Sequence, residues 1–220
     1  TLNANMGNPI GWFKDGKSLL LNMLPKERKQ LINTAEAVPT GPTISTSDGS
    51  KAQNRTYQDL LQNPNDIFNF EQLATSTLVK QELSGASKQW ASADMYTNVS
   101  FSPDGKYIMT TTIHKPFSYI VPYNRFPETV SIYKEDGTLV KVVNEVPLIE
   151  ELPQGFMATQ TGKRNLSWRA DEPATLYWAE ALDKGDPEVD VPFRDQVYMQ
   201  KAPFTEAPKK LVKTINRFRG

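Results

Sequence analysis

The chain contains a single histidine, His114, so catalysis by a Ser-His-Asp triad would have to use it. No Gly-x-Ser-x-Gly segment, the sharp corner that exposes a nucleophilic serine, occurs in the sequence. The lack of cysteine excludes disulfides, thiol catalysis and cysteine zinc sites, and one histidine excludes two-histidine metal motifs. We therefore expect no catalytic residue, metal or cofactor here. His114 is interpreted as structural or solvent-facing, with a place in a ligand channel as the alternative.

Three acidic residues close in sequence, Asp183, Asp186 and Glu188, offer oxygen ligands for a calcium ion. Their spacing fits no EF-hand loop, and a solvated loop is the favoured interpretation. The glycine-rich motifs that bind phosphates are also absent, so nucleotide binding has no support.

Three arginines, Arg164, Arg169 and Arg194, lie in or beside strand-like segments that are rich in aromatic residues. A guanidinium can hold a carboxylate through two parallel hydrogen bonds, so these residues could bind an acidic ligand. We favour the alternative that they pair with acidic residues of the chain and tie neighbouring sheets together. The candidate acidic partners are Asp171, Glu180 and Asp195.

Residues 115–127 contain four aromatic residues and three prolines, a composition typical of a stiff loop or an edge strand. Such a segment can present its rings to a bound peptide. A loop that packs its rings into a core of its own is an equally good interpretation.

The elements that would position these residues are hairpins with a recurring turn. An aromatic residue precedes Asp15-Gly16, Pro103-Asp104-Gly105 and Asp171-Glu172-Pro173, and an apolar strand follows each turn. A further hairpin turns at Asp136-Gly137. Asp-Gly corners are explained by turn geometry, so we assign Asp15, Asp104 and Asp136 no other role.

Composition supports a fold of short strands, since hydrophobic residues make up 38% of the chain and there are 16 prolines. The charges balance at 25 basic and 25 acidic residues, which gives no reason to expect nucleic acid as a partner. No apolar run is long enough for a membrane span.

Residues 40–51 are predicted to form a loop rich in Gly, Pro and Ser, and residues 56–73 to form two short helices broken at Asn63-Pro64-Asn65. We predict an all-β fold, a partial β-propeller of about three to four antiparallel blades with a short helical insertion near 56–73, and a β-sandwich as the alternative.

Taken together, these segments resemble the N-terminal propeller of the prolyl oligopeptidase family of serine peptidases, in particular its bacterial envelope members of the glutamyl endopeptidase and acylaminoacyl-peptidase-like type. The match covers about residues 7–205, and its most specific blocks are Arg-Thr-Tyr-Gln-Asp-Leu-Leu at 55–61 and Ser-Trp-Arg-Ala-Asp at 167–171. The other blocks that carry the resemblance are residues 39–42, 101–106, 116–119, 125–127, 162–164, 176–183 and 194–195.

The resemblance implies a two-part enzyme, in which a propeller covers the active site of a C-terminal α/β-hydrolase domain and limits entry to peptides. This chain lacks the motifs of the hydrolase domain, so we interpret residues 1–220 as one propeller fragment with an insertion at 25–75. Its expected function is to gate and bind peptide substrate for the parent enzyme, without catalysis of its own. The alternative is a non-catalytic envelope propeller that binds a protein or glycan partner. A complete small β enzyme is poorly supported.

Within the parent enzyme, we expect a small set of residues to face the peptide substrate. This set is His114, Phe117, Tyr119, Arg125 and Arg164. The expected partners are the peptide and the hydrolase domain of the same polypeptide. An incomplete ring leaves open sheet edges, which predicts either self-association or a frayed terminal blade. Because the resemblance is to envelope enzymes and the chain starts at Thr1, we expect a periplasmic or secreted protein whose signal peptide has been removed or lies outside residues 1–220.

Overall fold

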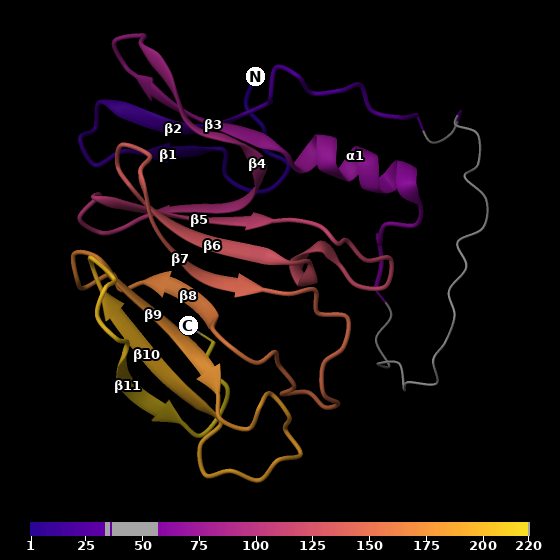
Figure 1. Ribbon diagram of the computed structural model, residues 1–220, viewed down its shortest axis with the longest axis vertical. Helices are drawn as coiled ribbons and strands as arrows, with labels where there is room; N and C mark the ends of the chain where they lie inside the picture. Colours follow the sequence, from indigo (N-terminus) through magenta and orange to yellow (C-terminus); the bar gives the residue numbers. More distant parts are fainter. Residues whose placement is uncertain (34–35, 37–56, 220) are drawn as a thin grey trace.

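The computed structural model describes residues 1–33, 36 and 57–219, and this part of the chain is mostly β-strand with one α-helix (Figure 1). The all-β prediction is thus confirmed. The loop expected at 40–51 and the resemblance block at 39–42 lie outside the described residues, as do the first two residues of the block at 55–61. The elements are β1 (Ile10–Trp12), β2 (Ser18–Met23), α1 (Pro64–Ala74), β3 (Ser76–Glu82), β4 (Ser87–Phe101), β5 (Tyr107–Ile113), a 3-10 turn (Tyr123–Arg125), β6 (Glu128–Lys134), β7 (Leu139–Val146), β8 (Arg164–Trp168), β9 (Thr175–Ala181), β10 (Asp195–Lys201) and β11 (Lys209–Thr214).

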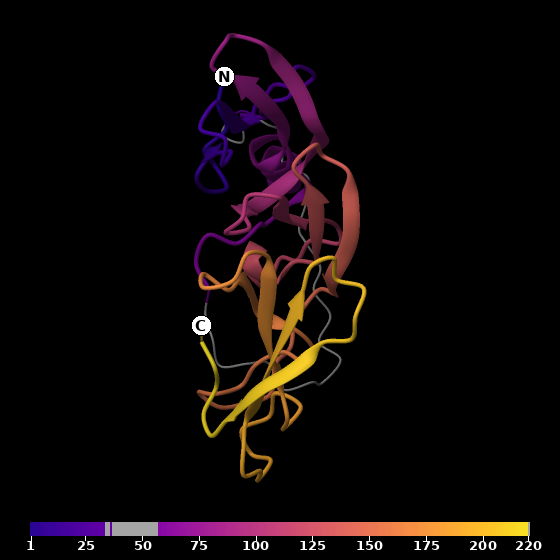
Figure 2. The same ribbon diagram turned by 90° about the vertical axis from the view of Figure 1, so that its left-hand side faces the viewer.

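The strands form three successive antiparallel meanders of four strands each, and the first two share a strand. Strand β4 pairs with β3 as far as Asp94 and with β5 from Met95 onward, so one seven-stranded sheet runs in the order β1 to β7. The third meander is a separate sheet in the order β11-β10-β9-β8. We call β1–β4, β4–β7 and β8–β11 the first, second and third meander. They follow one another along the long axis of the molecule (Figures 1 and 2).

The tight turns form as the sequence predicts, because each turn aspartate accepts hydrogen bonds from the backbone of its own corner. Asp15 Oδ1 accepts from the Lys17 N–H at 2.8 Å, and Asp136 Oδ1 accepts from the Thr138 N–H at 2.9 Å. Asp104 Oδ1 accepts from the Lys106 N–H at 3.1 Å in the same way. These hydrogen bonds explain why an aspartate stands at each of the three turns.

The meanders pack face to face through two apolar clusters. Between the first and second meanders lie the buried residues Phe13, Leu20, Leu78, Trp90, Tyr96 and Ile108. Between the second and third lie Met109, Val130, Ile132, Val143, Leu176, Trp178 and Phe204. The second meander therefore buries both of its faces, and its strands need apolar residues on both.

The helical insertion is confirmed as a single helix rather than two. The Asn63 side chain accepts hydrogen bonds from the N–H groups of Asn65 and Asp66, and Pro64 occupies the first helical position. The expected break at Asn63-Pro64-Asn65 is wrong because these residues start a helix, and residues 57–63 contain none. Phe70 of α1 packs on a third cluster that includes Met95, Ile113 and Phe126.

The described strands do not close into a ring, and four of them lie at sheet edges: β1, β7, β8 and β11. Edge β11 carries Lys209, Lys210 and Lys213, a composition that discourages pairing with a further strand. None of the helices in the described residues is long and apolar enough to cross a membrane.

Candidate functional site

A polar cavity of about 470 Å³ lies between the first half of β4 and the inner face of β5 and β6. It opens where the apolar packing of the first two meanders gives way to small and polar side chains. Its lining is Trp90, Ala91, Ser92, Asp94, Tyr96, Thr110, Thr112, His114, Thr129, Ser131, Tyr133 and Gly137.

The floor of the cavity is a row of hydroxyl groups set by strand periodicity. Thr110 and Thr112 alternate along β5, and the register places Ser131 and Thr129 of β6 opposite them. Residues two apart share one face of a strand, so all four hydroxyls face the same side of the sheet. Thr110 is 1% exposed and Ser131 is 7% exposed, which makes this an unusually polar stretch of a buried interface.

One end of the cavity is closed by the turn between β6 and β7. The Trp90 indole N–H donates a hydrogen bond to the Glu135 carbonyl at 2.8 Å, and its ring packs on Tyr133 with centroids 5.3 Å apart. Gly137 has a φ of +90°, and a Cβ atom there would lie 2.7 Å from the Trp90 carbonyl oxygen. Only glycine allows this close approach.

Asp94 and His114 lie at the other end, among the hydroxyl groups. Burial raises the pKa of Asp94 above its usual value, although the Met95 N–H and His114 act in the opposite direction. Burial also raises the pKa of Tyr96 and Tyr133, and the nearby Asp94 charge contributes to both shifts. Asp94, His114 and the two phenols therefore share one electrostatic environment. The His114 ring itself contacts the Lys115 carbonyl through Nδ1 at 3.0 Å and the Thr129 hydroxyl through Nε2 at 3.3 Å.

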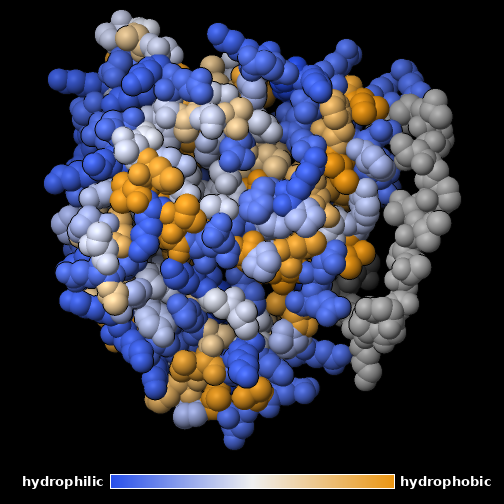
Figure 3. Space-filling model, viewed as in Figure 1, coloured by the Kyte–Doolittle hydropathy of each residue, from blue (hydrophilic) through white to orange (hydrophobic). Residues whose placement is uncertain are grey.

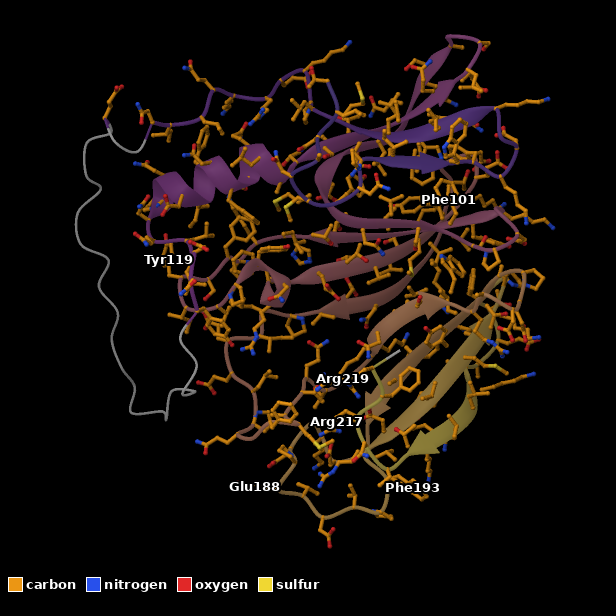
Figure 4. The ribbon with its side chains drawn as sticks, turned by 180° about the vertical axis from the view of Figure 1, so that it is seen from behind. Phe101, Tyr119, Glu188, Phe193, Arg217 and Arg219 are labelled. Atoms are coloured by element: carbon orange, nitrogen blue, oxygen red, sulfur yellow. The ribbon has the colours of Figure 1, made fainter. Side chains whose placement is uncertain are left out.

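The structure separates the residues of the predicted substrate-facing set. His114 is exposed, which agrees with its favoured interpretation as a solvent-facing residue, and it also lines the cavity. Phe117 stacks on Phe126 with ring centroids 5.0 Å apart, so the loop at 115–127 has a packed core. Arg125 lies over the Tyr57 ring at 5.3 Å. Tyr119 is half-buried and far from the third meander (Figure 4).

Arg164 is apart from the others, in a buried ion-pair network of the third meander. Its Nη2 lies 2.6 Å from Asp195 Oδ2, and its side chain is 9% exposed. Arg194 pairs with Asp183 at 2.7 Å. Arg217 joins both carboxylates, with contacts of 2.7 Å to Asp183 and 3.1 Å to Asp195.

Two expectations about charged residues need correction. In the acidic loop, Glu188 is exposed as expected and Asp186 is half-buried, but Asp183 is 1% exposed because two guanidinium groups replace its water. No group of potential metal ligands is found among the described residues. The arginines pair with acidic residues as favoured, but they do not tie sheets together. Arg164 and Arg194 pair within the third meander, and Arg169 pairs with Asp171 and Glu172 in the turn that follows β8.

Sequence reasoning missed most of the cavity, above all Asp94 and the four hydroxyl residues of β5 and β6. The alternation of residues along β5 could have indicated the cavity. Thr110, Thr112 and His114 alternate with Met109 and Ile113, so one face of this strand is polar in a segment that must be buried on both faces.

No protein-family model matches the chain. The chain is similar to plant proteins named as peptidases. It is 42% identical over 187 residues to a probable chloroplastic glutamyl endopeptidase of Oryza sativa subsp. japonica, covering 84% of this chain and 20% of that protein. It is 38% identical over 209 residues to the protein of the same name from Arabidopsis thaliana, covering 94% of this chain and 22% of that protein. The chain thus spans about a fifth of the length of these relatives.

These relatives support a peptidase-related family and correct the expected location. Both are plant proteins named as chloroplastic, so the expectation of a periplasmic or secreted protein is wrong. Compartments are encoded in targeting segments rather than in the strands of a folded domain, so the sheet residues could not distinguish these compartments.

Proposed function

We propose that this chain is the substrate-gating, peptide-binding propeller portion of a serine peptidase of the prolyl oligopeptidase family. The observation that carries the proposal is the succession of three four-stranded antiparallel meanders, packed face to face in sequence order. Propellers are built by this kind of radial repetition, with four to eight blades in a closed ring. The similarity to proteins named glutamyl endopeptidase supports the proposed peptidase activity of the parent.

In this proposal the remaining four fifths of a parent of similar length hold further blades and a C-terminal α/β-hydrolase domain. The propeller covers the catalytic serine and admits peptides but not folded proteins. Its substrate-facing residues are His114, Tyr119 and Arg125, which lie on or beside the long loop between β5 and β6. Phe117 and Arg164 have structural roles instead, because the first packs on Phe126 and the second pairs with Asp195. We propose the chloroplast as the compartment of the parent.

The test is active-site labelling of the chain and of the full-length parent with a fluorophosphonate probe. We expect labelling of the parent at a serine outside residues 1–220, and no labelling of the 220-residue chain. A labelled serine within the chain contradicts the proposal, and so does a parent that hydrolyses no peptide.

A second measurement examines the gate itself, through peptide hydrolysis by the full-length parent. We expect His114→Ala and Tyr119→Ala to raise KM severalfold with little change in kcat, since they affect binding rather than chemistry. Thr138→Ala, on the exposed hairpin corner away from this loop, is the control. Unchanged kinetics in both variants would remove these residues from the gate.

We also propose that the isolated chain self-associates through its open edges. The lysines of β11 disfavour that edge, so β1, β7 and β8 are the edges we expect to pair. Sedimentation velocity over a range of concentrations tests this, and a strict monomer at all concentrations contradicts it.

A further inference from the structure

We propose that the cavity between the first and second meanders binds a primary ammonium group, such as the end of a lysine side chain or the α-amine of a peptide. The inference does not depend on the peptidase assignment, because the described part of the chain supplies every group that it uses. It assigns a ligand chemistry to the polar cavity between the first two meanders.

The charge of the lining favours a cation. Asp94 is the one carboxylate that lines the cavity, and no lysine or arginine lines it in the part of the chain that the structure describes. Asp94 Oδ1 accepts a hydrogen bond from the Met95 N–H at 2.7 Å. In the described part of the chain Asp94 forms no ion pair with a lysine or arginine, and its side chain is exposed, so the carboxylate can pair with a cationic ligand.

The hydroxyl groups supply the remaining hydrogen-bond acceptors. An ammonium group donates three hydrogen bonds and accepts none. Thr112 and Thr129 face one another across β5 and β6 at the same end of the cavity as Asp94 and His114. The Tyr96 hydroxyl donates to the Ser92 carbonyl at 2.9 Å, which leaves its oxygen available as an acceptor.

Aromatic rings line the opposite end of the cavity from Asp94. Trp90 and Tyr133 pack on one another at 5.3 Å, and both belong to the cavity wall. Rings at that end offer an apolar surface to the alkyl stem of a ligand whose ammonium group lies at Asp94. Carboxylate, hydroxyl and aromatic groups around one cavity are a combination that suits an alkylammonium ion and disfavours an anion.

The size of the cavity limits the ligand to a small group. A volume of about 470 Å³ is in the usual range of small-molecule sites and can hold one extended side chain with its terminal charge. Neutral apolar ligands of the same length would leave the Asp94 carboxylate without a cationic partner.

The single histidine provides a clean reporter for the experiment, because the Cε1–H of His114 gives one imidazole resonance in the proton NMR spectrum of the full 220-residue chain. We would titrate the chain at constant pH with N-acetyl-lysine amide, alanine amide and N-acetyl-norleucine amide. The first carries an ε-ammonium, the second an α-ammonium, and the third has an apolar stem without charge. We expect a saturable shift with at least one of the two amines and none with the norleucine compound.

Two substitutions test whether amine binding depends on the Asp94 carboxylate. Asp94→Asn should weaken amine binding about tenfold, the effect of removing a charge-assisted hydrogen bond. Asp15→Asn, in an exposed turn of the first meander, is the matched control and should bind as the wild type does. If Asp94→Asn does not fold, Thr112→Val removes one hydroxyl acceptor at constant shape and should weaken binding severalfold.

The results of the titrations distinguish the two possible sources of the ammonium group. Binding of N-acetyl-lysine amide alone assigns the site to lysine side chains, binding of alanine amide alone assigns it to peptide N-termini, and binding of both supports recognition of any primary ammonium group. No saturable shift with either amine overturns the inference. Equal binding of the norleucine compound, or unchanged affinity in a folded Asp94→Asn chain, also overturns it.

Discussion

The guanidinium of Arg217 donates a hydrogen bond to the carboxylate of Asp183 at 2.7 Å, although 34 positions separate the two residues. The same side chain contacts Asp195 Oδ1 at 3.1 Å and the Met157 carbonyl at 2.9 Å. Phe218, the next residue, packs on Tyr177 of β9 with ring centroids 6.1 Å apart. The C-terminal segment therefore crosses one face of the third meander, and the contacts of Arg217 hold it in this position (Figure 4).

The first prediction concerns the stability of this attachment. Arg217→Met should lower the free energy of unfolding by about 3 kcal/mol, since it leaves two buried carboxylates with fewer partners. The Arg217 side chain is 6% exposed and Asp183 and Asp195 are fully buried, so water cannot replace the lost bonds. Urea denaturation measures the change.

Arg169→Met is the matched control, because its partner Asp171 is largely exposed, and we expect a loss of at most about 1 kcal/mol. Similar losses in the two variants would mean that burial does not strengthen the Arg217 network.

The second prediction is a loss of stability in acid that depends on Asp183. Burial alone would raise the pKa of this carboxyl, but hydrogen bonds from Arg217 and Arg194 outweigh burial and hold the pKa below its usual value. An unfolded aspartate has a pKa of about 3.9, so below that pH the unfolded state binds the proton more readily than the folded state does. The contribution is therefore present above about pH 4 and is lost as pH falls toward the folded pKa.

Urea denaturation at neutral pH and near pH 3 tests this linkage. Asp183→Asn should reduce the dependence of stability on pH, whereas Asp190→Asn, an exposed residue of the same loop, should leave it unchanged. An identical pH dependence in the wild type and in Asp183→Asn would refute the assignment.

The third prediction compares two glycines in similar turns. Gly137→Ala combines a φ of +90° with a contact of 2.7 Å between the new Cβ and the Trp90 carbonyl, whereas Gly16 has a φ of +65° and nothing within 4 Å. We expect Gly16→Ala to cost about 1 kcal/mol from backbone strain and Gly137→Ala at least about 2 kcal/mol. Equal melting temperatures for the two variants would show that the turn is not held against Trp90.

The fourth prediction is that Phe117 stabilises the loop rather than binding a ligand. It packs edge-on against Phe70 at 5.3 Å and stacks on Phe126 at 5.0 Å. Phe117→Ala should lower the free energy of unfolding by about 2 to 3 kcal/mol, less than for a fully buried ring. Tyr123→Ala, whose ring is 49% exposed, should cost under about 1 kcal/mol. Comparable losses would place both rings at the surface of the loop.

The face of the molecule in Figure 3 gives no simple indication of where partners bind. Figure 3 shows apolar residues interspersed with hydrophilic ones on the face it presents, without one continuous apolar area. Single exposed apolar residues are normal on soluble proteins, so the cavity between the meanders is the more informative feature.

Local chemistry was readable from the sequence alone. The turn at Asp136-Gly137 depends on a few neighbouring residues, so their types fix the backbone there. The strands between such turns, and hence the all-β class, follow from the same local rules. The prediction of two helices failed because a proline that starts a helix and one that ends it look alike in sequence.

Tertiary structure alone decided the environments of the charged residues. Asp183 looks like a member of a solvated acidic loop until Arg194 and Arg217 are brought to it by the pairing of β9, β10 and β11. Asp94 lines the cavity because β4 continues from one meander into the next and turns a polar face toward β5 and β6. Burial and charge pairing depend on residues distant along the chain, so no local pattern could encode them.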